Sequence, residues 1–469
     1  MTRYVVAVVG AGPSGIYAAE ALTQQSEVEV EVAVIDRLPV PFGLVRYGVA
    51  PDHPSIRSIR TTLQRTLEKT GVRFFGDVMI GRDLTVEELR DSVDAMIYAY
   101  GAGASRRLGI DGEDALGSLT APDFVAWYCG HPDAHPDEPA AEIDHGDTGA
   151  LLDGATAAVV VGAGNVALDV TRVLIKTADE LAGTDMAREV LEVLARKTIT
   201  DVHLLARRGP AYTQMTTKEL RELGAIDDCD VIVHPADLDW KAEAAYGVGK
   251  VAVRNLDTIR AWADGSRRTG GARRIHLHFW TRPTSITTAH DDRFGADRVA
   301  EVEYVDNRPG GEATGRVSAQ LVVRAIGYHG IELPAVPFDT ASGRVPHVEG
   351  RVLHPPADGA VPQAQFAVGE YVTGWIKRGP TGVIGTNKSD AVETVHSLLL
   401  DIAEGDLQPT HPRGLDGLTQ LMLERGITPL DLPAWHRIDA AEIDRGRADG
   451  RERTTLAHRS ELLAAARQG

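Results

Sequence analysis

The apolar positions near the start of the chain predict a strand, a tight turn, a helix and a second strand. The stretch YVVAVVGAGPSGIYAAEAL has a β-branched run at 4–9, then apolar positions at helical spacing as far as Leu22. A second apolar run at 28–35 ends at Asp36. The turn between the first strand and the helix contains Gly10, Gly12, Pro13, Ser14 and Gly15. This order predicts a βαβ unit with a glycine-rich first turn.

The same order returns in the middle of the chain. The stretch AAVVVGAGNVALDVTRVLI predicts a strand and an amphipathic helix. The turn between them contains Gly162, Gly164, Asn165, Val166 and Ala167. A further helical pattern at 179–197 precedes the strand of HLLARRGP, whose end bears Arg207 and Arg208. The chain therefore carries two similar units.

Glycine-rich turns of this kind are typical of dinucleotide-binding sites. The first glycine permits the tight turn, the second lets the backbone approach a pyrophosphate, and the third position allows close packing of helix on strand. Asp36 lies 26 residues after Gly10, at the end of the next strand, where a carboxylate can accept hydrogen bonds from a ribose diol. The alternative for each unit is a strand–turn–helix crossover that binds no ligand.

The two units differ in charge at the end of the second strand. A ribose with a free 2'-hydroxyl is usually met by Asp or Glu, whereas a 2'-phosphate attracts guanidinium groups. Asp36 in the first unit therefore predicts FAD, and Arg207 and Arg208 in the second predict NADP(H). The alternative is that these arginines are simply exposed at a strand end.

The positions of the two units predict a nested architecture. We expect an α/β fold with two Rossmann-like dinucleotide-binding domains, in which the NADP domain (106–328) is inserted in the FAD domain (1–105 and 329–469). Other periodic stretches predict a helix at 56–70, strands at 72–80 and 94–100, a strand ending at Gly327 and a helix at 389–403. The charged stretch WHRIDAAEIDRGRADGRERT predicts a tail on the surface.

Two irregular stretches are candidates for the walls of a flavin site, because hydride transfer needs alignment and exclusion of water more than it needs an acid or base. In GWIKRGPTGVIGTNK, Gly382 leaves room for a stacked ring, the amides of Val383 and Ile384 can reach flavin oxygens, and Trp375 can cover an exposed face. The alternative is a glycine-rich loop that leads into the last helix, capped by Ser389 and Asp390.

The second stretch, LPVPFGLVRYGVAPDHPSI, holds four prolines and a single imidazole, that of His53. His53 could hydrogen-bond to a carboxamide or help to protonate reduced flavin. The alternative is a histidine that is only a satisfied polar group in its turn.

Composition excludes several classes. A net charge of -18 argues against binding to nucleic acid or an anionic membrane, and no apolar run is long enough for a membrane span. The only cysteines, Cys129 and Cys229, form no C-x-x-C pair, which excludes dithiol chemistry, a disulfide framework and a structural zinc; we expect no metal. No secretory signal is evident, so we expect a cytoplasmic protein. Basic clusters at 57–73 and 254–274 could nonetheless attract an acidic protein, or could be accidental.

Five of these motifs occur together in the order found in one family. VGAGPSGIYAAEAL, LPVPFGLVRYGVAPDHPSI, VVGAGNVALDVTRVL, ARRGPAYTQMTTKELREL and GWIKRGPTGVIGTNK resemble the adrenodoxin-reductase family of NADPH:ferredoxin oxidoreductases, in particular its bacterial FprA-type branch. The resemblance spans nearly the whole chain. Asp36 is a departure, since Glu is usual there, and AYTQMTT is less apolar than the usual run.

The resemblance implies a set of site residues. The residues implied at FAD are Gly10, Gly12, Pro13, Ser14, Gly15, Asp36, Leu44, Met79, Trp375, Gly382, Val383 and Ile384. Those implied at NADPH are Arg106, Gly162, Gly164, Asn165, Val166, Ala167, Arg207, Arg208, Glu219 and again Gly382. His53 and Glu222 match positions that line the nicotinamide pocket.

The resemblance also implies an activity and a partner. NADPH would give hydride to N5 of FAD, and the reduced flavin would pass single electrons to an acidic ferredoxin that can feed a cytochrome P450 or another acceptor. This ferredoxin would dock on a basic face that includes Arg221. Two cysteines are too few for an iron–sulfur cluster, so we expect the ferredoxin to be a separate protein. The alternatives are a flavin monooxygenase or oxidase, and a protein that binds both nucleotides without turnover.

Overall fold

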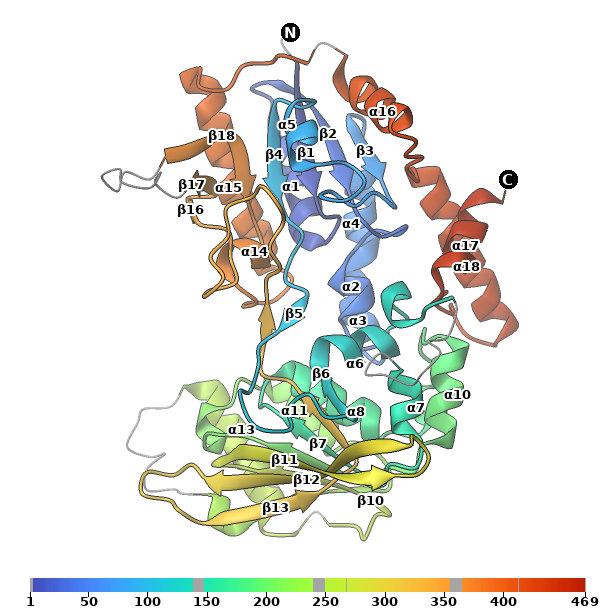
Figure 1. The fold of residues 1–469 in the computed structure, drawn as a ribbon, viewed down its shortest axis with the longest axis vertical. Helices are drawn as coiled ribbons and strands as arrows, with labels where there is room; N and C mark the ends of the chain where they lie inside the picture. The colour runs from blue at the N-terminus through green and yellow to red at the C-terminus, as the bar shows by residue number, and fades with distance from the viewer. Residues whose placement is uncertain are drawn as a thin grey trace. The chain divides into compact units, whose positions relative to one another are not determined.

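The computed structural model describes residues 3–137, 147–238, 249–266, 268–354, 365–411 and 413–468. Its contacts divide the chain into two compact units (Figure 1). Unit 1 comprises Met1–Ala104 and Tyr328–Gly469, and unit 2 comprises Ser105–Gly327. One unit is thus inserted in the sequence of the other. That each binds the nucleotide assigned to it from the sequence remains a proposal.

Unit 1 is built on a seven-stranded sheet in the order β16-β17-β18-β4-β1-β2-β3. Strands β18, β4, β1, β2 and β3 are parallel neighbours, whereas β16, β17 and β18 pair antiparallel. The strands are β1 (Arg3–Val9), β2 (Glu29–Ile35), β3 (Val72–Phe75), β4 (Ala95–Tyr98), β16 (His347–Val348), β17 (Arg351–His354) and β18 (Gln365–Val372). The central strands β1 and β4 are short and almost entirely buried, as expected where both faces of a sheet are covered.

The helices of unit 1 cover this sheet and extend to the end of the chain. They are α1 (Pro13–Gln24), α2 (Leu44–Tyr47), α3 (Pro54–Arg57), α4 (Ile59–Leu67), α5 (Val86–Arg90), α14 (Trp375–Arg378), α15 (Thr386–Glu404), α16 (Gly414–Glu424), α17 (Leu432–Ala448) and α18 (Arg459–Arg467). One core cluster joins Val5 and Ala33 of the sheet with Leu418 and Met422 of α16. The last helices therefore belong to the folded body of unit 1.

Unit 2 contains a six-stranded parallel sheet in the order β6-β14-β7-β8-β10-β9. Its strands are β6 (Ser118–Thr120), β7 (Ala157–Val161), β8 (Asp201–Leu205), β9 (Cys229–Val233), β10 (Arg273–His278) and β14 (Leu321–Arg324). A three-stranded antiparallel sheet of β11 (Thr281–Asp291), β12 (Ala296–Asp306) and β13 (Thr314–Ser318) shares a core cluster with it. Its helices include α6 (Ala121–Tyr128), α7 (Thr148–Leu152), α8 (Asn165–Ile175), α9 (Ala178–Leu181), α10 (Arg188–Arg196), α11 (Thr217–Leu223) and α13 (Lys250–Ala263).

Several predicted elements differ from the structure. The helix predicted at 56–70 is divided into α3 and α4, and the helical pattern at 179–197 forms α9 and α10. The strands predicted at 72–80, 94–100 and before Gly327 are shorter in the structure, at Val72–Phe75, Ala95–Tyr98 and Leu321–Arg324. The helix predicted at 389–403 is α15, which begins earlier, at Thr386, with Gly385 at its N-cap. Ser389 and Asp390 therefore lie inside this helix and do not cap it.

The charged stretch 435–454 is not the predicted surface tail. Trp435 is 1% exposed, Glu442 is 0% exposed and Thr454 is 0% exposed. The prediction was wrong because charge pattern alone does not reveal buried ion pairs, and Glu442 finds its partner in Arg46 far away in the sequence. No helix in the described ranges combines the length and apolar character that a membrane crossing requires.

Candidate functional site

The first glycine-rich turn leaves open space at one position and none at its neighbours. At Gly10, with φ at +114°, an added Cβ would lie 2.6 Å from the Ala99 carbonyl oxygen, and at Gly15 it would lie 1.9 Å from the Gly10 oxygen. At Gly12 a Cβ would meet nothing within 4 Å. Glycine at 10 and 15 is therefore required by the fold, whereas the space at Gly12 is free for a ligand that approaches the backbone.

Helix α1, which follows this turn, begins without a side-chain cap. Its N-cap is Gly12 and its first residue is Pro13, and no side chain of the described residues caps its first turn. In contrast, Thr85 caps α5 and Thr216 caps α11. An uncapped helix N-terminus beside open space fits a phosphate group, which would accept hydrogen bonds from these amides.

Asp36 holds the turn to the end of β2. Its Oδ2 accepts a hydrogen bond of 2.7 Å from the Ala11 amide, and its Oδ1 accepts one of 2.9 Å from the Leu38 amide. Burial raises the pKa of Asp36, and these two amides oppose that shift. Each carboxylate oxygen keeps a second lone pair. Asp36 can therefore fix the backbone and still accept a hydrogen bond from a ribose hydroxyl.

The stretch with four prolines packs on the same turn. The Phe42 amide donates to the Ala11 carbonyl over 2.8 Å, and a Cβ added at Gly43 would lie 3.1 Å from the Gly12 Cα atom. Leu44 begins α2 directly after this contact, so the structure brings it beside the turn.

Two further predicted residues lie elsewhere in unit 1. His53 is 4% exposed at the N-cap of α3, where its carbonyl accepts from the Ile56 amide. The backbone amide of Met79, on the loop after β3, donates to Asp83.

The motif GWIKRGPTGVIGTNK also reaches α1. At Gly374 an added Cβ would lie 2.3 Å from the Ser14 hydroxyl oxygen. The Ser14 hydroxyl donates to Asn387 Oδ1 over 2.9 Å, and Asn387 Oδ1 also accepts from Arg378 over 2.8 Å. The Gly374 amide donates to Asp390. Sequence reasoning gave no role to Arg378 and Asn387, which lie within the motif, and considered Asp390 only as a helix cap. The pattern of these residues gave no sign of the network.

The tip of this motif is exposed. Val383 is 71% exposed, and its amide donates to the Thr386 hydroxyl over 3.2 Å. Gly382 and Ile384 flank it, and the Trp375 ring lies 5.3 Å from the Tyr328 ring, both in unit 1. Unit 1 thus brings together its glycine-rich turn, Asp36, Leu44 and the start of the 374–388 motif.

The second glycine-rich turn repeats the geometry of the first. At Gly162, with φ at +141°, an added Cβ would lie 2.2 Å from the Ala325 carbonyl oxygen, whereas at Gly164 it would meet nothing within 4 Å. Ala167 is fully buried in the third position. Helix α8 begins at Asn165, with Val166 in its first turn and no side-chain cap. This turn too fits a phosphate at the helix N-terminus.

The stretch AYTQMTT (211–217), which is less apolar than is usual in the family, packs on this second turn. The Gln214 amide donates to the Ala163 carbonyl over 3.0 Å, and the Thr216 amide donates to Asn165 Oδ1 over 2.9 Å. Residues of AYTQMTT therefore hold the nucleotide turn in place, which gives this stretch a structural role besides any partner contact.

The two arginines lie at the end of the strand next to this turn. The Gly162 amide donates to the Leu205 carbonyl over 3.0 Å, which sets the end of β8 beside the turn. Arg207 and Arg208 follow, and both are exposed. Among the described residues neither guanidinium group forms an ion pair. Arg106 is exposed as well, and its amide donates to the Gly327 carbonyl. These unpaired cations are available to an anionic ligand.

Glu219 and Glu222 are joined by a buried arginine that sequence reasoning missed. Arg172, on α8, is 1% exposed and lies 3.0 Å from Glu219 Oε2, 3.5 Å from Glu222 Oε2 and 2.8 Å from Asp169 Oδ1. Arg172 thus connects the helix of the glycine-rich turn with α11. From sequence it is one basic position on an amphipathic helix, without a signal that distinguishes it.

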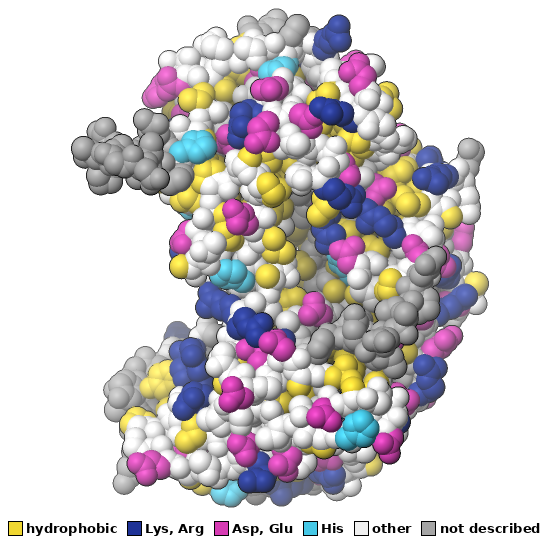
Figure 2. Space-filling model, viewed as in Figure 1, with side chains coloured by type: hydrophobic (Ala, Val, Ile, Leu, Met, Phe, Trp, Pro, Cys, Tyr) yellow, Lys and Arg dark blue, Asp and Glu magenta, His cyan; other side chains and the backbone are white. Residues whose placement is uncertain are grey.

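The two predicted basic clusters do not form continuous cationic faces. Arg57 is buried and donates to backbone carbonyls, and Arg73 pairs with Asp416. In the second cluster Arg273 pairs with Glu180 and Arg274 with Asp201, while Arg267 lies outside the described residues. Basic and acidic side chains are also interspersed on the face drawn in Figure 2. Ion pairs with residues far away in the sequence therefore neutralise part of each cluster, whereas Arg254 of the second cluster is exposed.

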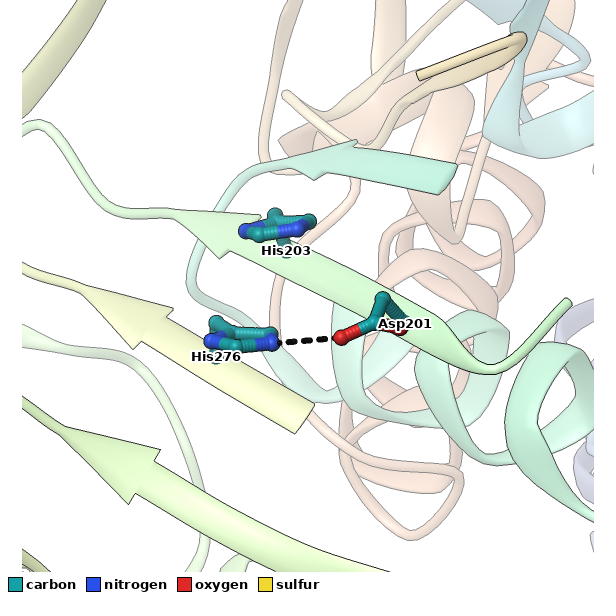
Figure 3. A group of neighbouring side chains, drawn as sticks. All are labelled: Asp201, His203 and His276. Atoms are coloured by element: carbon teal, nitrogen blue, oxygen red, sulfur yellow. Dashed lines mark hydrogen bonds and ion pairs between the residues drawn. The ribbon is translucent and has the colours of Figure 1, made fainter. Parts of the chain in front are cut away.

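A group of histidines lies on one face of β8 and β10 (Figure 3). The rings of His203 and His276 stack 4.3 Å apart at 8°, and His276 Nε2 lies 2.9 Å from Asp201 Oδ1. Arg274 donates to both oxygens of the same carboxylate. Imidazole lone pairs lie in the ring plane, so stacked parallel rings do not converge on one ion. This geometry favours a structural role over a metal site.

The low pKa of His203 predicts that the protein loses stability in acid. Burial, then the neighbouring His276 and His278, lowers the pKa of His203 to about 3. Because the unfolded chain takes up this proton near pH 6.5, stability is unaffected above that pH and falls as the pH drops towards the folded pKa. The loss at pH 5 is about 2 kcal/mol for this group.

Urea unfolding at pH 7 and pH 5 measures the effect. His203→Gln is expected to reduce the difference between the two unfolding free energies by about 2 kcal/mol. His396→Gln, at an exposed histidine of α15, is the control and should leave the difference unchanged. An unaltered difference in His203→Gln would show that this histidine is not held neutral.

Neither cysteine is set up for redox chemistry. Cys129 is buried, and burial raises the pKa of the Cys229 thiol to about 12, so it is protonated at neutral pH. Neither thiol is part of a disulfide among the described residues.

Comparisons with known proteins agree with the resemblance inferred from the motifs. Residues 4–224 match the family described as "Pyridine nucleotide-disulphide oxidoreductase". NADPH-ferredoxin reductase FprA of Mycobacterium tuberculosis is 40% identical over 483 residues, covering 99% of each chain. The mitochondrial NADPH:adrenodoxin oxidoreductase of Homo sapiens is 35% identical over 473 residues, covering 98% of this chain and 91% of that protein.

A solved structure extends the similarity to the fold. Mycobacterium tuberculosis FprA in complex with NADPH superposes with a TM-score of 0.86 at 39% identity, over 99% of both chains. The predicted fold class, with two Rossmann-like dinucleotide-binding domains of which one is inserted in the other, is confirmed. The chain therefore belongs to the family of NADPH:ferredoxin oxidoreductases that includes FprA and adrenodoxin reductase.

Proposed function

We propose that this chain is an FAD-dependent NADPH:ferredoxin reductase of the adrenodoxin-reductase type, which oxidises NADPH and reduces an iron–sulfur protein. Full-length similarity to reductases of this kind supports the activity. The observation that carries the assignment of cofactors is the pair of glycine-rich turns. They have the same open second position and uncapped helix, but one is followed by Asp36 and the other by Arg207 and Arg208.

In this proposal unit 1 holds FAD. The adenine ribose is bound at Asp36 and the pyrophosphate at the N-terminus of α1, where the amides are free of side-chain caps. The flavin end is held by the irregular stretches that pack on the turn. The proposed FAD contacts are Gly10, Gly12, Pro13, Ser14, Gly15, Asp36, Leu44, Met79, Trp375, Gly382, Val383 and Ile384.

Unit 2 holds NADP(H) in the same proposal. The pyrophosphate is bound at the N-terminus of α8, and the 2'-phosphate is bound by the exposed guanidinium groups at the end of β8. Glu219, held by Arg172, lies on the helix that follows the segment packed on this turn. The proposed contacts are Arg106, Gly162, Gly164, Asn165, Val166, Ala167, Arg207, Arg208, Glu219 and Gly382.

The residues of the chain align the reaction, since the cofactors carry the chemistry. When bound, FAD supplies the conversion of a two-electron oxidation of NADPH into single-electron transfers. The chain fixes the two nucleotides through their phosphates and riboses. We assign His53 and Glu222 to the nicotinamide, where the imidazole of His53 can donate a hydrogen bond to a carboxamide.

We further propose an acidic ferredoxin as partner, in a cytoplasmic pathway that can supply a cytochrome P450. A groove between α11 and α13 is lined by Thr217, Lys218, Arg221, Glu222, Ala225 and Arg254, and three of these six side chains are cationic. Arg221 and Arg254 are exposed. An acidic protein would be steered to this groove, and the association would weaken as salt rises.

Reduction of cytochrome c through an added ferredoxin tests the activity and the partner together. NADPH-dependent reduction is expected to require the ferredoxin, and the double variant Arg221→Glu with Arg254→Glu is expected to lower kcat/KM for the ferredoxin at least about tenfold at low salt. Ferricyanide reduction should stay unchanged in the same variant. Arg316→Glu, on β13 and outside the groove, is the control. Reduction of cytochrome c that is independent of the ferredoxin would argue for an oxidase.

A further inference from the structure

The C-terminal helices contact the loops that we assign to FAD. Helices α17 and α18, red in Figure 1, lie in unit 1. On α17, the Trp435 ring lies edge-on against Phe42, with centroids 5.5 Å apart. Phe42 has φ at 86°, a backbone region that non-glycine residues rarely adopt, and its amide donates to Ala11 in the glycine-rich turn. Such a conformation persists only where its surroundings hold it.

A buried ion pair fixes the helix that follows Phe42. Arg46, on α2, is 9% exposed and Glu442, on α17, is 0% exposed. The guanidinium group donates to both carboxylate oxygens, one over 3.0 Å. Glu442 also accepts from the Leu456 amide over 2.9 Å. Because Arg57 in turn donates to the Arg46 carbonyl, the pair is tied into the backbone on both sides.

A second tether reaches the corner that bears Asp36. Arg459, at the start of α18, donates to the Arg37 carbonyl over 3.0 Å and also binds the Asp77 carboxylate. The Asp77 amide donates to the Leu38 carbonyl, and the Val78 amide donates to the Asp36 carbonyl. One side chain of α18 thus joins the loops after β2 and β3.

Each of these contacts ends on a segment that contains or adjoins a proposed FAD residue: Phe42 and Arg46 flank Leu44, and Arg37 follows Asp36. We propose that α17 and α18 form a clasp that retains FAD, with Glu442 and Arg459 as positioning residues. The clasp holds the Phe42–Leu44 turn and the Asp36–Arg37 corner in the conformation that binds the cofactor. It rests on the proposed assignment of FAD to unit 1, and it gives the C-terminal helices a part in cofactor binding.

The rate at which FAD leaves the full-length holoprotein tests the clasp. After dilution, free flavin is followed by the recovery of its fluorescence. Glu442→Gln and Arg459→Gln are each expected to release FAD at least about tenfold faster than the parent protein, since each removes a charge-assisted hydrogen bond to a segment that adjoins the proposed FAD site. Far-ultraviolet circular dichroism at the assay temperature checks that the variants remain folded.

The control lies on the same two helices. Glu461 of α18 pairs with Arg445 of α17 over 2.7 Å without contacting an FAD loop. Glu461→Gln removes one charge from this partly exposed pair and leaves the contacts of Glu442 and Arg459 in place, so it is expected to keep the parent release rate. Glu442→Gln leaves Arg46 buried without its anion and could prevent folding. In that case Arg459→Gln decides the test, because Arg459 and its partner Asp77 are partly exposed.

Two results would overturn the clasp. One is a parent release rate in folded Glu442→Gln and Arg459→Gln, and the other is an equal acceleration in Glu461→Gln. A parent protein that binds no FAD at all would instead contradict the proposed function, so the two failures are distinguishable.

Discussion

Replacement of Arg207 and Arg208 together by alanine is expected to raise KM for NADPH by about 30- to 1000-fold and to leave KM for NADH nearly unchanged. The range corresponds to about 2 to 4 kcal/mol for the lost charge-assisted hydrogen bonds to the 2'-phosphate. The loss is not offset within the protein, because neither guanidinium group forms an ion pair among the described residues. Fold stability should change little, since both side chains are exposed.

Steady-state ferricyanide reduction with each nucleotide measures this change in preference. Arg316→Ala, which removes a different exposed arginine from unit 2, should alter neither KM value. A comparable increase in KM for NADPH and NADH would place the arginines outside the 2'-phosphate site and would contradict the assignment.

Gly164→Ala is expected to abolish measurable NADPH binding while FAD stays bound, and Gly12→Ala is expected to do the reverse. An added Cβ at either position meets no protein atom within 4 Å, so the fold itself accommodates the methyl group. The methyl group occupies the space through which a pyrophosphate approaches the backbone. We expect each substitution to weaken its own nucleotide by at least about 100-fold.

Calorimetric titration with NADP+ and the flavin content after gel filtration separate the two effects. Gly183→Ala is a matched control, because an added Cβ there also meets nothing within 4 Å and the residue lies outside both turns. Gly15→Ala is a contrasting case, since its Cβ would lie 1.9 Å from the Gly10 oxygen and the turn cannot form. If Gly12→Ala and Gly164→Ala both bind FAD and NADP+ normally, the two turns are strand–turn–helix crossovers that bind no nucleotide.

The local parts of the fold and site follow from sequence. Within each unit, the apolar runs, the glycine-rich turn and the acid or arginines at the next strand end are signals that lie within about 50 residues of one another. The glycines that the turns require stand at the positions that the pattern assigns, although the atoms that crowd Gly10 and Gly162 belong to the distant residues Ala99 and Ala325. The fold class could therefore be predicted from the order of a few motifs.

Contacts between distant segments could not be predicted in this way. Arg172 has the sequence signature of any basic helix position, yet it is 1% exposed and joins α8 to Glu219. Glu442 lies in a charged stretch whose pattern indicates a surface, and its partner Arg46 is 396 positions away. Ion pairing over such distances depends on the assembled fold, which single-sequence periodicity does not encode.

The most direct test of two nucleotide sites in one reductase is rapid anaerobic mixing of the purified protein with NADPH. The account predicts a yellow protein whose flavin absorbance near 450 nm bleaches rapidly, on the order of 1 to 1000 per second, the usual range of enzyme turnover, and far more slowly with NADH. A colourless protein that takes up no FAD on reconstitution, or a flavoprotein that NADPH does not bleach, would contradict it.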